Sequence, residues 1–431
     1  TGQIRVRVDP AVIAAAAEKL AADRWASAAQ RKAVETIAHA GLPLAEGILH
    51  ERATVLDLLQ GPERQALAHA HMAERMTRHI PEATAAPRPI AAAAVIGDNE
   101  NAIGFAAAFL HAGLAVTTLC DLEDRKAGLR AAILLRATEL GQASVTPRAE
   151  SLSLASRFAV TTDLAALHAA DLVVIASEHA VSTTIACLDP VVRPGVVIGV
   201  VTAGDAFAAL SDAGNRSQDI VGLHAVQPPG PSRLLEVQLA DITAPEAVAT
   251  VFALAARMRM VAVRNLGRPV GMRIHAHCHR FAQQMLLAGV PPSRLDRLIA
   301  DAGLGPRRFA DAVPAAPNRP RALDAAPALA DDAIVARYFA AMTLEACRAL
   351  DQGASLRATD IDATLLGYGL RRTLGGLFHM ADRMGLPGLI AQIDSWSAEA
   401  PDFWHLPDRL RQLARRKGHF ADLNKEQMRE S

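Results

Sequence analysis

The sequence predicts an α/β protein with a doubly wound sheet near the middle of the chain and helical segments on either side. Between about residues 90 and 264, short apolar runs alternate with helical patterns, which is typical of parallel βαβ units. Before and after that stretch, apolar residues recur at helical spacing. The length of 431 residues indicates two to four domains.

Residues 1–88 are expected to form an N-terminal helical linker region that precedes the sheet. A loop rich in proline and alanine closes it at residues 81–89. The apolar spacing predicts four helices, at residues 12–22, 28–39, 45–59 and 62–79.

Residues 89–268 are expected to form the sheet domain. Helices are predicted at residues 102–112, 123–140 and 245–257. Short apolar runs predict strands at residues 90–96, 115–119, 171–175, 196–201, 220–224, 234–239 and 260–264.

The rest of the chain is expected to be helical. We divide it into a shortened helical domain (269–316), a linker rich in proline and alanine (317–330) and a second helical domain (331–431). In the last of these, helices are predicted at residues 331–352, 359–382 and 386–396.

The composition argues against several classes of function. Lys plus Arg equals Asp plus Glu at 45 each, so charge gives no support for nucleic-acid binding. The four cysteines lack metal-site or redox-site spacing and are typical of reduced thiols. No apolar run approaches the roughly 20 residues that cross a bilayer, and the N-terminus has no signal-peptide pattern. We therefore expect a cytoplasmic protein without a membrane span.

A turn with part of a dinucleotide-binding fingerprint follows the first strand. The usual pattern is GxGxxG, and Gly97, Asn99 and Ala102 occupy its three glycine positions. The first glycine makes the tight turn, the second lets the backbone approach pyrophosphate, and alanine is tolerated at the third. Asp98 and Glu100 oppose the helix dipole that attracts phosphate. Two interpretations stay open: a Rossmann-type domain that binds NAD, or one that has lost its cofactor.

An acidic residue normally ends the second strand and holds the ribose hydroxyls. Cys120 occupies the aligned position, and Asp121 follows it. A one-residue offset would bring Asp121 into use, although adjacent residues at a strand end point in opposite directions. Asp121 is the candidate ribose ligand.

His224 and Glu236 are the candidate catalytic pair. His224 ends a strand at the edge where open α/β sheets place ligand chemistry. A turn rich in proline then leads to a second strand, on which Glu236 can return to face the histidine. A carboxylate behind an imidazole fixes its tautomer and raises its basicity, which makes a general base for a hydroxyl proton.

Two other side-chain groups are interpreted as structural. His275 and His279 share a helix face at the spacing of metal ligands, but no acidic partner stands nearby in the sequence. We therefore predict no metal site there. Trp396, Phe403 and Trp404 are expected to pack the last helices.

Together these motifs resemble those of the (S)-3-hydroxyacyl-CoA dehydrogenases, in particular the dehydrogenase half of multifunctional fatty-acid β-oxidation proteins. Residues 42–52 and 73–75 resemble the segment that joins a crotonase-type hydratase domain to the dehydrogenase, and the hydratase domain itself is absent from this chain. The resemblance rests on residues 95–97, 171–175, 188–195, 222–224, 234–237, 270–274, 357–362 and 367–369.

The resemblance implies NAD-dependent oxidation of a 3-hydroxyacyl-CoA to the 3-ketoacyl-CoA. His224 would take the hydroxyl proton, and Glu236 would orient His224. The implied partners are an acyl-CoA and a crotonase-type hydratase domain or chain, and we expect a homo-oligomer.

Some family positions differ. Ala203 and Met272 replace polar residues that contact substrate in the family, while Glu178 is retained in the loop after residue 175 as a candidate cofactor contact. The alternative function is therefore a catalytically degenerate module that serves as a scaffold or as an acyl-CoA-binding partner of an enoyl-CoA hydratase or isomerase. A pocket reshaped for an unusual substrate is a third interpretation.

Overall fold

The computed structural model describes residues 9–23, 26–141, 153–177, 181–201, 207, 214–226, 233–305, 309 and 329–424. The expected site residues Glu178 and Ala203 lie outside the described residues, as does nearly all of the predicted linker at 317–330.

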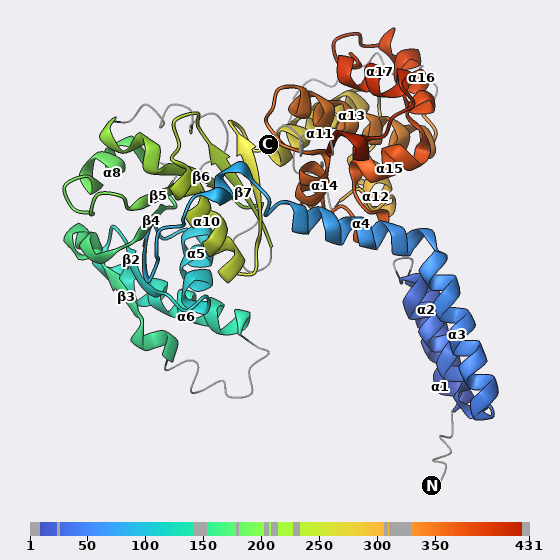
Figure 1. Cartoon of the computed structure of the whole chain (residues 1–431), viewed down its shortest axis with the longest axis horizontal. Helices are drawn as coiled ribbons and strands as arrows, with labels where there is room; N and C mark the ends of the chain where they lie inside the picture. The colour runs from blue at the N-terminus through green and yellow to red at the C-terminus, as the bar shows by residue number, and fades with distance from the viewer. Residues whose placement is uncertain are drawn as a thin grey trace.

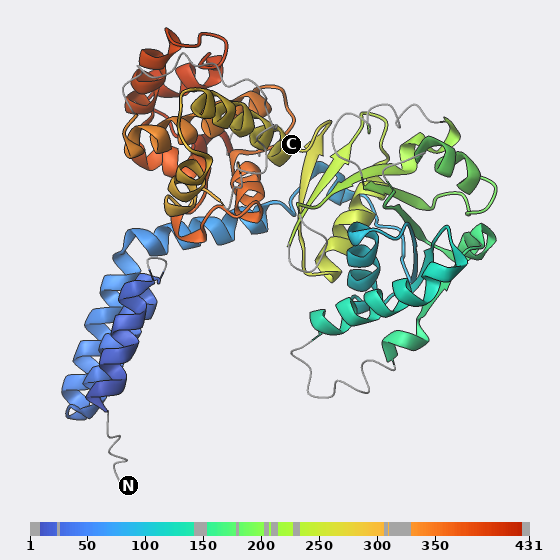
Figure 2. The same cartoon turned by 180° about the vertical axis from the view of Figure 1, so that it is seen from behind.

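Four helices precede the sheet, as predicted: α1 (Pro10–Ala22), α2 (Ala28–Ala38), α3 (Leu44–Gln60) and α4 (Pro62–Met76). The first three lie side by side in a bundle that projects away from the rest of the chain (Figures 1 and 2). They bury none of their described residues. α4 continues along the C-terminal helices and buries Ala66, Ala70 and Ala73, so it is the helix that attaches the bundle.

The described part of the chain holds an eight-stranded sheet in the order β3-β2-β1-β4-β5-β6-β7-β8. Neighbouring strands are parallel except β6 and β7. The order reverses between β1 and β4, as in doubly wound folds. The strands are β1 (Ala92–Ile96), β2 (Ala115–Leu119), β3 (Phe158–Thr161), β4 (Leu172–Ile175), β5 (Val197–Val201), β6 (Ile220–His224), β7 (Leu234–Leu239) and β8 (Val261–Leu266).

Helices cover both faces of this sheet (Figure 1). On β4, Val174 packs with α5 and α6, whereas Val173 and Ile175 pack with α8 on the opposite face. This alternation follows from the two-residue period of a strand, and it explains why β4 is apolar along its whole length, as in sheets buried on both sides. The covering helices are α5 (Glu100–His111), α6 (Lys126–Leu140), α8 (Val181–Leu188) and α10 (Pro245–Arg257).

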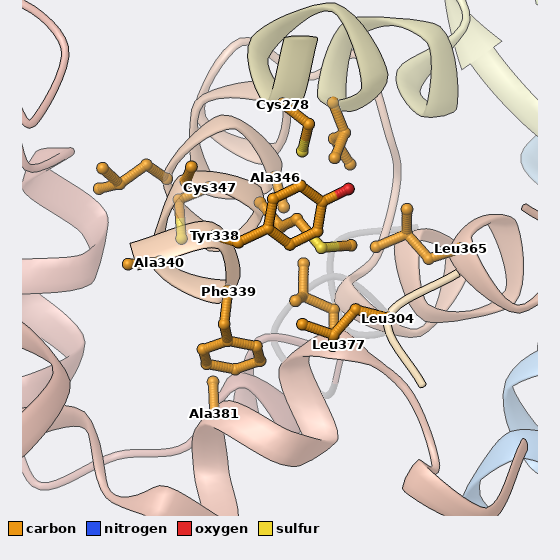
Figure 3. Close-up of a cluster of buried hydrophobic side chains, with 14 of the residues drawn as sticks. Cys278, Leu304, Tyr338, Phe339, Ala340, Ala346, Cys347, Leu365, Leu377 and Ala381 are labelled. Carbon is orange, nitrogen blue, oxygen red and sulfur yellow. The ribbon is translucent and has the colours of Figure 1, made fainter. Parts of the chain in front are cut away.

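The helices after β8 share one hydrophobic core. Tyr338 lies inside it with Cys278, Leu365 and Leu377 around it (Figure 3). Within the described residues, no helix is long and apolar enough to cross a membrane. The helices are α11 (Val270–Leu287), α12 (Pro292–Asp301), α13 (Asp331–Asp351), α14 (Ala358–Gly367), α15 (Leu377–Met384), α16 (Leu386–Ser397) and α17 (Asp408–Arg415).

The single helix predicted at residues 359–382 is wrong. The chain leaves the helix after Gly367 and starts α15 only at Leu377. Gly375 and Gly376 have φ angles of +88° and +148°, which helices do not contain. A Cβ on Gly376 would lie 2.3 Å from Asp362, so the turn depends on both its φ and its missing side chain. Short 3₁₀ turns complete the chain: η1 (His39–Gly41), η2 (Pro81–Thr84), η3 (Glu123–Arg125), η4 (Leu164–Ala169), η5 (Gly214–Asp219) and η7 (Arg372–Leu374).

Candidate active site

The two predicted catalytic residues lie opposite each other in the sheet. His224 ends β6, and its partner across the antiparallel β6–β7 pair is Glu236. Side chains directly opposite in such a pair leave the sheet on the same face. The strand pairing therefore brings the two residues together across the described strands, as the sequence predicted.

A third residue, Tyr368, connects them. The His224 Nε2 atom lies 3.1 Å from the Tyr368 hydroxyl, and that hydroxyl donates to Glu236 Oε2 at 2.9 Å. No direct hydrogen bond joins His224 to Glu236 among the described residues. Tyr368 follows α14, so the site combines strands of the sheet with a helix from the C-terminal part of the chain. Sequence reasoning used residues 367–369 only as a family signature and did not place this side chain in the site.

Gly271, in the first turn of α11, makes room for the tyrosine. Its N–H donates to Glu236 Oε1 at 2.9 Å. A Cβ at this position would lie 2.1 Å from the Tyr368 ring, far inside van der Waals contact. The same backbone segment therefore binds the carboxylate and admits the ring.

Burial controls the charges of the pair. Glu236 is fully buried, and desolvation raises its pKa to about 7, against the opposing effect of the hydrogen bonds from Gly271, Tyr368 and Val270. Burial lowers the pKa of His224 to about 4. The imidazole is therefore neutral at physiological pH and able to accept a proton.

The nucleotide turn lies at the same edge of the sheet. Gly97 follows β1 with a φ of +129°, and a Cβ there would lie 3.2 Å from the Ala176 carbonyl oxygen. Only glycine suits this turn, which lies at the switch point where doubly wound sheets bind dinucleotides. His224 stands three strands away, roughly 14 Å along the edge at the usual strand spacing. The turn and the first part of α5 thus fit a bound dinucleotide.

Asn99 stabilises this turn from within. Its Oδ1 accepts from the N–H of Ala102 at 2.9 Å and caps α5, while its Nδ2 donates to the carbonyl of Ala176. Asp98 forms an ion pair with Arg125 at 2.5 Å, and Glu100 forms one with Arg136 at 3.3 Å, so both negative charges at the turn are offset. These contacts give Asn99 and Ala102 a structural role, and their predicted contact with a cofactor stays a prediction.

At the end of β2, the structure shows which of Cys120 and Asp121 is accessible to a ligand. Cys120 is buried, with its Sγ 3.5 Å from the carbonyl oxygen of Leu122, whereas Asp121 is exposed. Asp121 is therefore an accessible carboxylate at the strand end where Rossmann-type domains hold the ribose, and its role as ribose ligand stays a prediction.

The remaining predicted residues have these positions. Met272 is partly buried in α11, next to Gly271. His275 and His279 approach each other through their Nε2 atoms at 2.9 Å. Within the described ranges, no group of three or more histidine, cysteine or acidic residues is arranged to hold a metal ion. Trp404 packs against Trp396 and Phe403, as predicted.

Comparison with known proteins agrees with this geometry. Residues 92–267 match the family model of the 3-hydroxyacyl-CoA dehydrogenase NAD-binding domain. The peroxisomal fatty acid beta-oxidation multifunctional protein of Oryza sativa subsp. japonica is 23% identical over an alignment of 447 positions, gaps included, which covers 86% of this chain and 61% of that protein. The peroxisomal bifunctional enzyme of Danio rerio is 29% identical over an alignment of 293 positions, gaps included, which covers 64% of this chain and 40% of that protein. The chain thus spans 40–61% of the length of these relatives.

Solved structures share the fold. The 3-hydroxybutyryl-CoA dehydrogenase of Escherichia coli K12 aligns with a TM-score of 0.62 at 16% identity, over 77% of this chain and 99% of that chain. The dehydrogenase part of multifunctional enzyme 1 from C. elegans aligns with a TM-score of 0.55 at 15% identity, over 80% and 96%. The resemblance inferred from the sequence motifs is confirmed for residues 92–267, which match the NAD-binding domain model of the 3-hydroxyacyl-CoA dehydrogenases.

Proposed function

We propose that this chain is an NAD-dependent 3-hydroxyacyl-CoA dehydrogenase of β-oxidation-type metabolism, which interconverts a 3-hydroxyacyl-CoA and its 3-ketoacyl-CoA. The observation that carries the proposal is the position of His224. It is a neutral imidazole at the carboxyl edge of the sheet, hydrogen-bonded through Tyr368 to the buried Glu236.

In this mechanism the residues of the chain hold the ligands and move one proton. The Gly97 turn and the N-terminus of α5 would hold the diphosphate of NAD, and Asp121 would hold the adenosine ribose. NAD supplies the hydride acceptor. His224 removes the proton of the substrate hydroxyl as its carbon loses hydride, and it returns that proton in the reverse direction.

A second candidate function is a module that binds acyl-CoA without catalysis. It is favoured by the contacts of the nucleotide turn, where the Asn99 side chain already occupies the N–H of Ala102. This contact leaves one N–H fewer at the helix N-terminus to bind phosphate.

Titration with NADH separates the two candidates. The protein is titrated with NADH by fluorescence, and acetoacetyl-CoA is then added while NADH absorbance is followed. Saturable binding followed by consumption of NADH is expected for the dehydrogenase. Absence of binding at millimolar NADH would contradict it and favour the non-catalytic module.

The variant His224→Gln tests the assigned base. It should lower kcat by roughly 10²–10⁴-fold, the usual contribution of a general base, and leave the NADH affinity unchanged. Unchanged turnover in a folded variant would refute the assignment. His168→Gln, on the exposed η4 turn, is the matched control.

The expected partners extend the proposal. A crotonase-type hydratase domain or chain would supply the 3-hydroxyacyl-CoA, since the curated relatives that this chain matches are longer than it is. The cytoplasmic location, the homo-oligomeric state and the domain boundaries stay predictions.

A further inference from the structure

We propose that Tyr368 is a positioning residue that fixes the tautomer of His224, so that the Nδ1 atom of His224, and not Nε2, is the general base. The use of that base rests on the proposed function. The tautomer itself follows from three side chains and can be measured without a substrate.

The direction of the hydrogen bonds can be worked out from the Glu236 end. An ionised carboxylate has no proton and can only accept. Tyr368 has a single hydroxyl proton, and at 2.9 Å it donates this proton to Glu236 Oε2. Toward His224 Nε2, which lies 3.1 Å away, the tyrosine oxygen can then only accept. Nε2 must therefore carry the hydrogen.

A neutral imidazole carries one proton, so Nδ1 is left with a free lone pair. No hydrogen bond joins Nδ1 to a residue that the structure describes, and the side chain is partly exposed. Nδ1 is thus the nitrogen that remains available for a substrate hydroxyl.

Protonation of Glu236 reverses the direction of these two hydrogen bonds. A neutral Glu236 can donate to the Tyr368 oxygen, and the tyrosine then donates to Nε2. The imidazole hydrogen must then sit on Nδ1, which blocks the base. Because burial raises the pKa of Glu236 to about 7, this reversal falls in the neutral range.

Few groups act on either end of the chain of hydrogen bonds. Glu236 faces the N–H groups of Val270 and Gly271 on α11 and the hydroxyl of Tyr368, and no described charged side chain shifts its pKa. Only burial shifts the pKa of His224. Glu236 is therefore the group whose titration sets the tautomer.

The fold is built to seat the tyrosine here. Gly271 leaves space for its ring on the α11 side. Gly367, the residue before it, packs on β7, where a Cβ would lie 2.5 Å from the Leu234 side chain. Two close backbone approaches thus press the end of α14 between α11 and β7, and Tyr368 is held there at 7% exposure.

Nitrogen NMR of histidine side chains tests the tautomer directly. Protein labelled with ¹⁵N-histidine is recorded from pH 5.5 to 8.5, and the His224→Gln variant identifies the His224 signals. We expect the Nε2–H tautomer at pH 8.5 and a shift toward Nδ1–H as the pH falls through about 7. In Tyr368→Phe the preference and its pH dependence should both be lost. Tyr338→Phe, in the core of the C-terminal helices, is the matched control and should behave as the wild type.

Kinetics supply the second readout. Tyr368→Phe should lower kcat roughly 10–100-fold, part of the roughly 10²–10⁴-fold that a general base contributes. The NADH affinity should not change, and the fall of kcat at low pH should disappear. Gly271→Ala displaces the ring without removing a hydroxyl and should give the same loss. Gly128→Ala, a helical glycine with open space around it, should not.

The outcomes separate the two claims. If the wild type shows no turnover but Tyr368→Phe changes the His224 tautomer, the role of Tyr368 stands and the proposed dehydrogenase activity fails. If the wild type is active and Tyr368→Phe leaves tautomer, kcat and pH profile unchanged, the role of Tyr368 is refuted and the activity stands.

Discussion

Replacing Glu236 by glutamine should stabilise the sheet at alkaline pH while it impairs the site. Glu236 is completely buried, and burial raises its pKa in the folded chain to about 7, against 4.5 for a glutamate in water. A carboxyl group with a raised folded pKa binds its proton more tightly in the folded chain. Its contribution to stability therefore falls as the pH rises from about 4.5 to 7 and is constant above that range.

The magnitude follows from the size of that shift. At about 1.4 kcal/mol per pKa unit, ionisation of Glu236 costs about 3 kcal/mol at pH 8 and about 1 kcal/mol at pH 5. Glutamine has nearly the same shape and does not ionise. The stability difference between Glu236→Gln and the wild type should therefore favour the variant by about 2–3 kcal/mol more at pH 8 than at pH 5.

Hydrogen exchange of the amides in β6 and β7 provides the assay, because it reports local opening free energies and does not require a chain of several domains to unfold in one step. Subtracting the wild type removes the contributions of His224 and of every other titrating group. Glu46→Gln, on the exposed side of α3, should show no such pH dependence. An equal stability difference at pH 5 and pH 8 would refute the reasoning.

Two further variants test the turn and the attachment of the N-terminal bundle. Gly97→Ala adds a Cβ 3.2 Å from the carbonyl after β4, in a backbone with positive φ, and should weaken NADH binding at least about tenfold, equivalent to about 1.4 kcal/mol, in a fluorescence titration. Gly113→Ala also has positive φ but meets nothing within 4 Å, so equal weakening there would rule out the steric explanation. His69→Ala removes the 2.7 Å hydrogen bond from α4 to the buried Asp362 and should cost about 1–3 kcal/mol, seen as faster limited proteolysis of residues 1–80. The control His71→Ala, at an exposed position of α4, should be cleaved at the wild-type rate. Cleavage of His69→Ala at the wild-type rate would show that this hydrogen bond does not attach α4.

Much of the sheet could be predicted because its strands are buried on both faces. A fully buried strand is a short apolar run, and runs such as residues 171–175 and 234–239 stand out from their surroundings. β3 (Phe158–Thr161) was missed because it lies at the edge of the sheet, where only Phe158 is buried and no continuous apolar run is needed.

The catalytic pair could be predicted in part. His224 and Glu236 are twelve residues apart on two adjoining strands, so a local argument placed them face to face. Tyr368 is separated from them by 144 and 132 positions. No periodicity or local spacing connects residues so far apart; only the packing of α14 on the sheet does. Gly271 and Gly367 make room for the end of α14, but the sequence alone does not show why these positions are glycine. The reason becomes visible only in the packed structure.

The predicted helix at residues 359–382 fails for a related reason. Its apolar spacing continues through the two glycines at 375 and 376, and spacing alone gives no sign of the turn. The turn is fixed by tertiary contacts: Asp362 accepts from the N–H of Phe378 at 2.8 Å and lies where a side chain on Gly376 would be.

The late position of Tyr368 has a consequence for biosynthesis. The strands that carry His224 and Glu236 leave the ribosome more than 100 residues before the tyrosine that lies between them. A nascent chain can complete its nucleotide domain at this stage, but the Tyr368 hydroxyl that fixes the tautomer of His224 has not yet been synthesised. His224 therefore acquires its proposed proton-accepting form only when synthesis has passed α14 and that helix has docked.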